Sequence, residues 1–152
     1  MYCMIYALSL GLSCLSTAVM GKRANQLGGI HWHKFFCIPI DNNSTPHRMA
    51  EMAINKIQCN SVILNSILTL DVILADEFGQ LSSEFIGTID IILHHLRRSN
   101  LMFGGVLLIG TLDHTQIQPW KGRPFLTSPQ IIPCFEMVNL KHSVRTNNQN
   151  SQ

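Results

Sequence analysis

Apolar residues at the start of the chain form two runs with different spacing. Residues 1–10 are apolar and uncharged, which predicts a core helix that ends at Gly11. Residues 13–18 have the pattern of a buried strand, and a short helical turn is expected over residues 21–27. A helix followed by a strand indicates an α/β arrangement.

The middle of the chain repeats this alternation twice. A helix is expected over residues 47–57, after a polar loop. The apolar run over residues 62–75 is too long for one strand, so it divides into the end of a helix and a strand over residues 71–75. A further helix over residues 82–98 has serines at its start and two arginines at its end, and a glycine pair precedes a strand over residues 106–111.

Strands that alternate with helices predict an α/β fold in which a parallel sheet carries helices on both faces. Ligands of such sheets bind beyond the carboxyl ends of the strands. Asp76 and Glu77 follow the second predicted strand, and residues 113–116 follow the third. Residues 146–152 are all polar and are expected to form a disordered tail, which leaves residues 1–145 as one domain.

Composition excludes some classes of protein. With 46% hydrophobic and 13% charged residues, the chain is not of the disordered class, and its net charge of +2 does not by itself predict a nucleic-acid surface. Five cysteines without a CxxC pair indicate reduced thiols in an intracellular protein. Residues 1–20 could also be a secretory signal, although they lack a positive start and hydroxyl residues interrupt the apolar run.

An apolar strand that ends in two carboxylates has the form of a Walker B element. In nucleotide hydrolases the Asp holds Mg²⁺ directly or through water, and the Glu can polarise the attacking water. Asp76 and Glu77 follow the apolar residues 72–75 in this way. The alternative interpretation of such a pair is a solvated loop or a helix cap.

Four segments add to this signal. They are TAVMGKRA with GGIHWHKF at residues 17–24 and 28–35, DEFGQL at 76–81, FGGVLLIG with DHTQIQP at 103–110 and 113–119, and LKHSVR at 140–145. In this order they resemble the Pif/RecD group of superfamily-one DNA helicases over residues 12–145. The segments resemble, in turn, the family's contact to single-stranded DNA, its Asp-Glu motif, the motif whose Gln senses the γ-phosphate, and a segment that ends in a phosphate-contacting Arg.

The resemblance implies a RecA-like first motor domain that uses ATP and Mg²⁺ to unwind DNA from 5′ to 3′, in repair or recombination. It assigns Mg²⁺ to Asp76 and makes Asp76, Glu77, Gln116 and Arg145 the catalytic candidates. Asp76, Asp113, Gln116 and Arg145 are the implied contacts to the nucleotide. A Gln can pair with a phosphate oxygen and the nucleophilic water, and a fixed Arg offsets charge on the γ-phosphoryl group. The implied location is the nucleus or the mitochondrion, with no membrane partner.

Single-stranded DNA is the implied partner of the first segment. The two glycines would let the backbone approach a phosphate closely, while histidine and lysine would supply polar contacts and the tryptophan a stacking face. For the tryptophan, the alternative is core packing. The candidates are Gly28, Gly29, His31, Trp32, His33 and Lys34.

The sequence departs from the family pattern at several positions. Leu112 stands where the family has a glycine, Gln118 replaces the first proline of a pair, and Met20 replaces a threonine. These changes alter the expected geometry of the third segment and remove one hydroxyl contact from the first.

No phosphate-binding loop of the form GxxxxGK[ST] occurs in the 152 residues. At the pair Gly21-Lys22 the pattern would need a glycine at Ser16 and a hydroxyl group at Arg23. We therefore expect a sheet that is incomplete at the N-terminus and a chain that is impaired in catalysis. An exposed sheet edge, marginal stability and aggregation would follow.

Two other functions are open. The chain could be a non-catalytic module that binds single-stranded DNA or a partner helicase through residues 28–34, which salt-sensitive binding to an oligonucleotide would support. It could also be a metal protein, because His31 and His33 would share one side of a strand. The further histidines available as ligands are His94, His95, His114 and His142.

Overall fold

Three parallel strands form the sheet of the computed structural model, which describes the chain except for residues 1, 20–27, 41–43, 113–121, 130 and 141–152. The strands are β1 (Cys14–Ala18), β2 (Val72–Asp76) and β3 (Leu107–Gly110), in the order β1-β2-β3. Cys14 is opposite Val72, which is opposite Leu107, so the strands begin level with one another. The predicted α/β class with a parallel sheet is confirmed.

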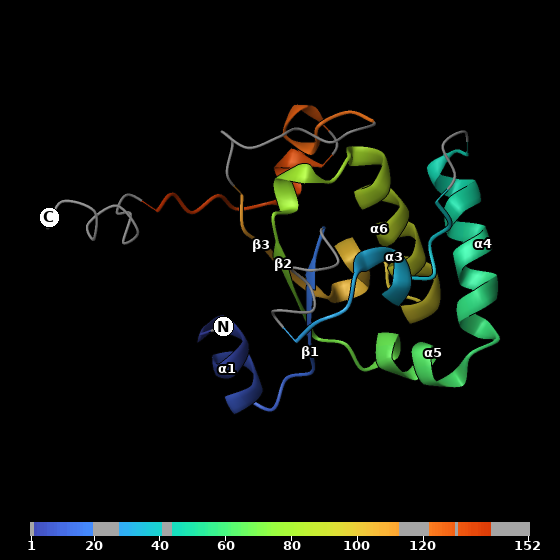
Figure 1. Ribbon diagram of the computed structural model, residues 1–152, viewed down its shortest axis with the longest axis horizontal. Helices are drawn as coiled ribbons and strands as arrows, with labels where there is room; N and C mark the ends of the chain where they lie inside the picture. The colour runs from blue at the N-terminus through green and yellow to red at the C-terminus, as the bar shows by residue number, and fades with distance from the viewer. Residues whose placement is uncertain (1, 20–27, 41–43, 113–121, 130, 141–152) are drawn as a thin grey trace, which may run out of the picture.

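Helices cover both faces of this sheet, as predicted (Figure 1). One face packs against a layer of four helices, and α1 lies on the opposite face, against β1 and β2. The helices are α1 (Tyr2–Ser9), α3 (Trp32–Phe35), α4 (Pro46–Gln58), α5 (Ser61–Leu68) and α6 (Ser83–Arg97). The 3-10 helices are η1 (Phe78–Gln80), η2 (Met102–Gly105), η3 (Phe125–Thr127) and η4 (Ile132–Cys134).

The prediction that α1 is a helix of the core is wrong, because most of its side chains are exposed. Gly11 ends the helix as expected, with φ of +76° and with the amide of Leu12 donating to the carbonyl of Ala7. Ala7 is the one buried residue of α1, however, whereas the side chain of Tyr2 is 90% exposed. The apolar composition of α1 therefore does not place it in the core, because no described element covers its outer side.

The apolar run at residues 62–75, predicted to hold the end of a helix and a strand, begins within a complete short helix, α5. The side chain of Asn60 accepts hydrogen bonds from the amides of Val62 and Ile63, so α5 starts separately from α4. The start of α6 follows the sequence-based prediction, since the hydroxyl of Ser82 accepts from the amide of Phe85. Local capping thus sets the helix boundaries on this side of the sheet.

The edge of the sheet at β3 is open in the described part of the chain. Leu107 and Ile109 point to the face that holds α1, and their side chains are 57% and 41% exposed. An exposed sheet edge was expected; marginal stability and aggregation stay predictions. Within the described ranges, no helix has the length and apolar character needed to cross a membrane.

The side chain of Arg97 connects α6 by hydrogen bonds to the segments that precede β2 and β3. Its Nη1 lies 2.9 Å from the carbonyl oxygens of Ile67 and Leu68, at the end of α5, and of Leu70, which precedes β2. Its Nε donates over 2.9 Å to the carbonyl of Gly104, before β3. Arg97 lies in the last turn of its own helix, as predicted, and its guanidinium also binds carbonyls at the negative end of α5.

Replacing Arg97 by lysine should destabilise the fold. An ammonium group cannot reach the carbonyls of α5, Leu70 and Gly104 together, so some of them lose their donor. We expect Arg97→Lys to lower the free energy of unfolding by about 1–3 kcal/mol in urea titrations followed by circular dichroism. The exposed neighbour Arg98 gives the matched control, because Arg98→Lys should change it by less than about 0.5 kcal/mol. Equal effects of the two variants would contradict this role.

Candidate functional site

Asp76 and Glu77 lie at the carboxyl end of β2, the middle strand of the described sheet, where the sequence placed them. Glu77 has a left-handed backbone, with φ of 56° and ψ of 35°, which a residue with a side chain adopts at a cost. Its Oε2 is buried and has no hydrogen-bond partner among the described residues. A strained backbone and an unsatisfied buried carboxylate oxygen together mark this position as a candidate site.

Thr111 is a part of this site that the sequence analysis missed. Its hydroxyl donates to Oδ1 of Asp76 over 2.7 Å and accepts from the amide of Glu77 over 3.1 Å. Its position directly after β3 was the available signal, because the carboxyl ends of neighbouring parallel strands meet at one edge.

Close packing supports the turn after Glu77. A Cβ atom added to Gly110 would lie 2.8 Å from the Cβ of Phe78, so β3 can approach the turn only with a glycine there. Leu112, which departs from the family pattern, has its side chain against Gly79, where an added Cβ would lie 2.6 Å from a methyl group of Leu112. The larger side chain at position 112 is thus accommodated by a glycine in the turn.

Asp76 and Glu77 are suited to holding Mg²⁺. Carboxylate oxygens are the ligands that this ion prefers, and usually only one or two of them bind it directly while water and phosphate oxygens complete the shell. The buried oxygen of Glu77 fits a polar group, such as ion-bound water, beside Asp76, because burying this oxygen without a partner is otherwise unfavourable.

Trp32 is core rather than a stacking surface, so its predicted contact with DNA bases is wrong. The side chain is 1% exposed, and its ring stacks on Phe36 with centroids 5.9 Å apart. The cause is the start of α3, where Nδ1 of His31 accepts from the amide of His33 and caps the helix. This start turns Trp32 inward.

His31 also joins α3 to the end of β1. Because its Nδ1 accepts from an amide, its Nε2 must be the donor to the carbonyl of Val19, 2.8 Å away. The ring of His31 stacks on that of His33, with centroids 5.4 Å apart. The metal hypothesis assumed a strand here, and that assumption is wrong, because the two histidines lie at a helix start. In the ranges that the structure describes, no group of three or more His, Cys, Asp or Glu side chains is placed to hold a metal.

The two glycines before α3 differ in their surroundings. A Cβ atom on Gly29 would lie 2.0 Å from the carbonyl oxygen of Ser16, so the close approach at this glycine is to the protein's own β1. Gly28 has φ of +67° and open space around it, and Lys34 is exposed. Gly28 and Lys34 are therefore the accessible members of the predicted DNA contact, with half-buried His33 beside them.

Several predicted residues lie outside the described part of the chain. They include the nucleotide contacts Asp113, Gln116 and Arg145, the position Gln118, and the whole tail at residues 146–152. Their roles stay predictions.

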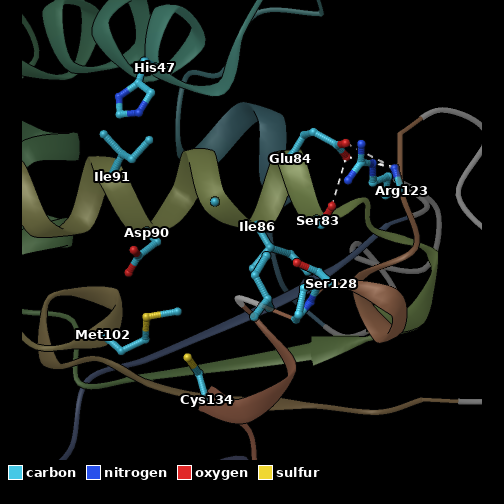
Figure 2. A pocket seen from close by; sticks show the side chains of 13 residues that line it. His47, Ser83, Glu84, Ile86, Asp90, Ile91, Met102, Arg123, Ser128 and Cys134 are labelled. Carbon is cyan, nitrogen blue, oxygen red and sulfur yellow. Dashed lines mark hydrogen bonds between the residues drawn. The ribbon is translucent and has the colours of Figure 1, made fainter.

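A separate hollow lies between α6 and the segments that follow it (Figure 2). It has a volume of about 570 Å³, and its lining includes Glu84 and Asp90 of α6 together with Arg123 and Cys134. Burial would raise the pKa of Glu84, but hydrogen bonds from the amide of Arg123 and from neighbouring serine hydroxyls lower it overall. None of the described residues predicted for catalysis lines this hollow.

The stability of the α3 region should fall in acid because of His33. Burial lowers the pKa of His33, although the carbonyl of Ile38 accepts a hydrogen bond from its Nδ1. A folded-state pKa below the ordinary value of about 6.5 means that His33 lowers stability as pH falls through about 6.5 and has no effect well above it. In unfolding titrations between pH 7.5 and 5.5, we expect His33→Asn to reduce the loss of stability and the exposed control His95→Asn to leave it unchanged. An unchanged pH dependence in His33→Asn would refute this assignment.

Comparison with known proteins adds to this geometry. The Pif1 helicase from Candida albicans superposes with a TM-score of 0.66 and 25% sequence identity, covering 76% of this chain and 25% of that one. Two structures from Bacteroides have 21% and 22% identity and thus show the fold alone: Pif1 bound to ssDNA, with TM-score 0.60, and the Pif1 helicase in complex with ADP-AlF3 and ssDNA, with TM-score 0.57. They cover 77% and 80% of this chain, and it covers 26% of each of theirs. No curated protein matches the sequence.

The chain thus spans about a quarter of the length of these solved helicases. The model of one family, described as PIF1-like helicase, matches residues 5–149, which is nearly the whole sequence. With a parallel sheet that ends in Asp76 and Glu77 and a family match of this extent, the chain belongs to the PIF1-like helicase family.

Proposed function

We propose that the carboxyl end of β2 is the Mg²⁺ and water site of an ATP-dependent DNA helicase, in which Asp76 holds the ion and Glu77 polarises the attacking water. The observation that carries the proposal is the buried Oε2 of Glu77, which has no partner in the described part of the chain, next to Asp76 at the end of the strand. Family membership supports it, and a Bacteroides Pif1 helicase was solved with ADP-AlF3 and ssDNA.

The two carboxylates are suited to different tasks. Asp76 is the last residue of a strand that is paired on both sides, so its backbone is fixed by the sheet. Glu77 leaves the strand in a left-handed conformation, and one of its side-chain oxygens is enclosed by protein. A Mg²⁺ ion held by Asp76 would neutralise charge on the phosphates. A carboxylate held in a site with little water can orient and polarise a nucleophilic water at short range.

Three further residues complete the proposed nucleotide site. Asp113 and Gln116 follow β3 in the sequence, and β3 ends beside β2. Asp113 is proposed to contact the nucleotide, Gln116 to pair with the γ-phosphate and the water, and Arg145 to offset charge on the transferred phosphoryl group.

Single-stranded DNA is the proposed partner of the surface around α3. Gly28 leaves its backbone accessible to a phosphate, and exposed Lys34 adds a positive charge. Trp32 is not part of this surface, because it is buried.

The site can be tested by titrating a fluorescent ATP analogue into the chain with and without Mg²⁺. Because the 152 residues contain no GxxxxGK[ST] loop to cradle the phosphates, we expect weak but saturable binding that needs Mg²⁺. Asp76→Asn should weaken this binding about tenfold or more, since an amide carries no charge to attract the ion.

Asp71→Asn is the matched control for this titration. Asp71 lies just before the other end of β2, where its carboxylate accepts from the amide of Ser13 over 2.8 Å, and an asparagine oxygen can accept the same bond. Equal binding by the wild type and Asp76→Asn, or equal losses in the two variants, would overturn the proposal. Salt-sensitive binding of an oligonucleotide without any binding of nucleotide would instead favour the non-catalytic module.

A further inference from the structure

The hydroxyl of Thr111 connects the two carboxylate residues of β2 to the end of β3. It accepts from the amide of Glu77 over 3.1 Å and donates to Oδ1 of Asp76 over 2.7 Å. The hydroxyl oxygen accepts a hydrogen bond from the Glu77 amide. An ionised carboxylate can only accept hydrogen bonds, so the hydroxyl proton must point at Asp76. The direction of the whole chain of hydrogen bonds is therefore fixed.

The position of this hydroxyl is set by main-chain bonds to both sides of the turn. The amide of Thr111 donates to the carbonyl of Ala75 over 2.9 Å, which continues the β2–β3 pairing by one residue. The carbonyl of Thr111 accepts from the amide of Phe78, also over 2.9 Å. The main chain of Thr111 is thus hydrogen-bonded to the residue before Asp76 and to the residue after Glu77, although the Thr111 side chain is exposed.

These contacts affect the two carboxylate residues in different ways. An amide that donates to a hydroxyl polarises it, which strengthens the hydrogen bond from that hydroxyl to the Asp76 carboxylate. At Glu77 the bond to the amide helps to keep a left-handed backbone that the residue would otherwise leave. Loss of this single hydroxyl would therefore release the carboxylate of Asp76 and loosen the backbone of Glu77.

We infer that Thr111 is a positioning residue of this site, whose hydroxyl fixes the Asp76 carboxylate for the ion and holds Glu77 in the conformation that buries its side-chain oxygen. The inference rests on the proposed function of Asp76 and Glu77, which it extends to a residue from the neighbouring strand.

The test compares Thr111→Val, which keeps the shape of the side chain without its hydroxyl, with Thr111→Ser, which keeps the hydroxyl. Carbon-13 NMR at a fixed pH of 7.5 reports the chemical shift of the Asp76 carboxyl carbon, and amide hydrogen exchange reports on Glu77. We expect Thr111→Val to shift the resonance of the Asp76 carboxyl carbon, because the hydrogen bond from the Thr111 hydroxyl is lost. It should also speed exchange at Glu77 about tenfold. Thr111→Ser should restore both to nearly the wild-type values.

Thr69→Val is the matched control, because the hydroxyl of Thr69 donates over 3.0 Å to a carbonyl at the end of α5, away from the site. It should change neither measurement. Exchange at Ile73, in the middle of β2, reports whether the sheet itself is intact. If Thr111→Val does not fold, Thr111→Ala removes the same hydroxyl and gives the same readings. The inference is overturned if the variants without the hydroxyl match the wild type, or if Thr111→Ser behaves like them.

This result can be separated from that of the nucleotide titration. If Asp76 and Glu77 respond as expected but the wild type binds no ATP analogue, the positioning role of Thr111 stands and the proposed function fails. If nucleotide binds and Asp76→Asn weakens it while Thr111→Val changes neither Asp76 nor Glu77, the proposed function stands and the positioning role is refuted.

Discussion

The guanidinium of Arg97 is the interaction on which the arrangement of the sheet depends. It donates to carbonyls at the end of α5, at Leu70 before β2 and at Gly104 before β3. One side chain thus satisfies backbone acceptors at the starts of two neighbouring strands, and the negative end of α5 favours its charge. Because both strands are parallel and begin beside this group, both also end at one edge, and that edge carries the candidate site.

Thr111 connects the carboxyl ends of β2 and β3, as Arg97 connects their starts. Its main chain extends the pairing past Ala75, and its hydroxyl reaches Asp76 and Glu77. The pair of carboxylates is therefore attached to strands that are fixed at both ends. This explains how Glu77 keeps a left-handed backbone and a buried, unsatisfied oxygen, both of which oppose folding unless the surroundings enforce them.

The sequence predicted the parts of the fold that local patterns control. The strand before Asp76 and the cap of α6 at Ser82 were found because apolar spacing and capping residues are read within a few positions. Burial depends on contacts that are distant in the sequence and was predicted less well. Trp32 is in the core because a histidine cap starts a helix there, and Tyr2 is exposed because nothing described covers α1. Thr111 was missed since a single threonine after a strand gives no pattern.

The most direct test of the central claim, that the end of β2 holds a metal ion, is anomalous diffraction from crystals of the chain grown with Mn²⁺ as a substitute for Mg²⁺. An ion bound by Asp76 should give an anomalous peak within about 2–2.5 Å of one of its carboxylate oxygens, the range for oxygen ligands of such ions. A peak placed instead at Asp90 or Glu84 in the hollow beside α6, or no peak at Asp76 at saturating Mn²⁺, would contradict it.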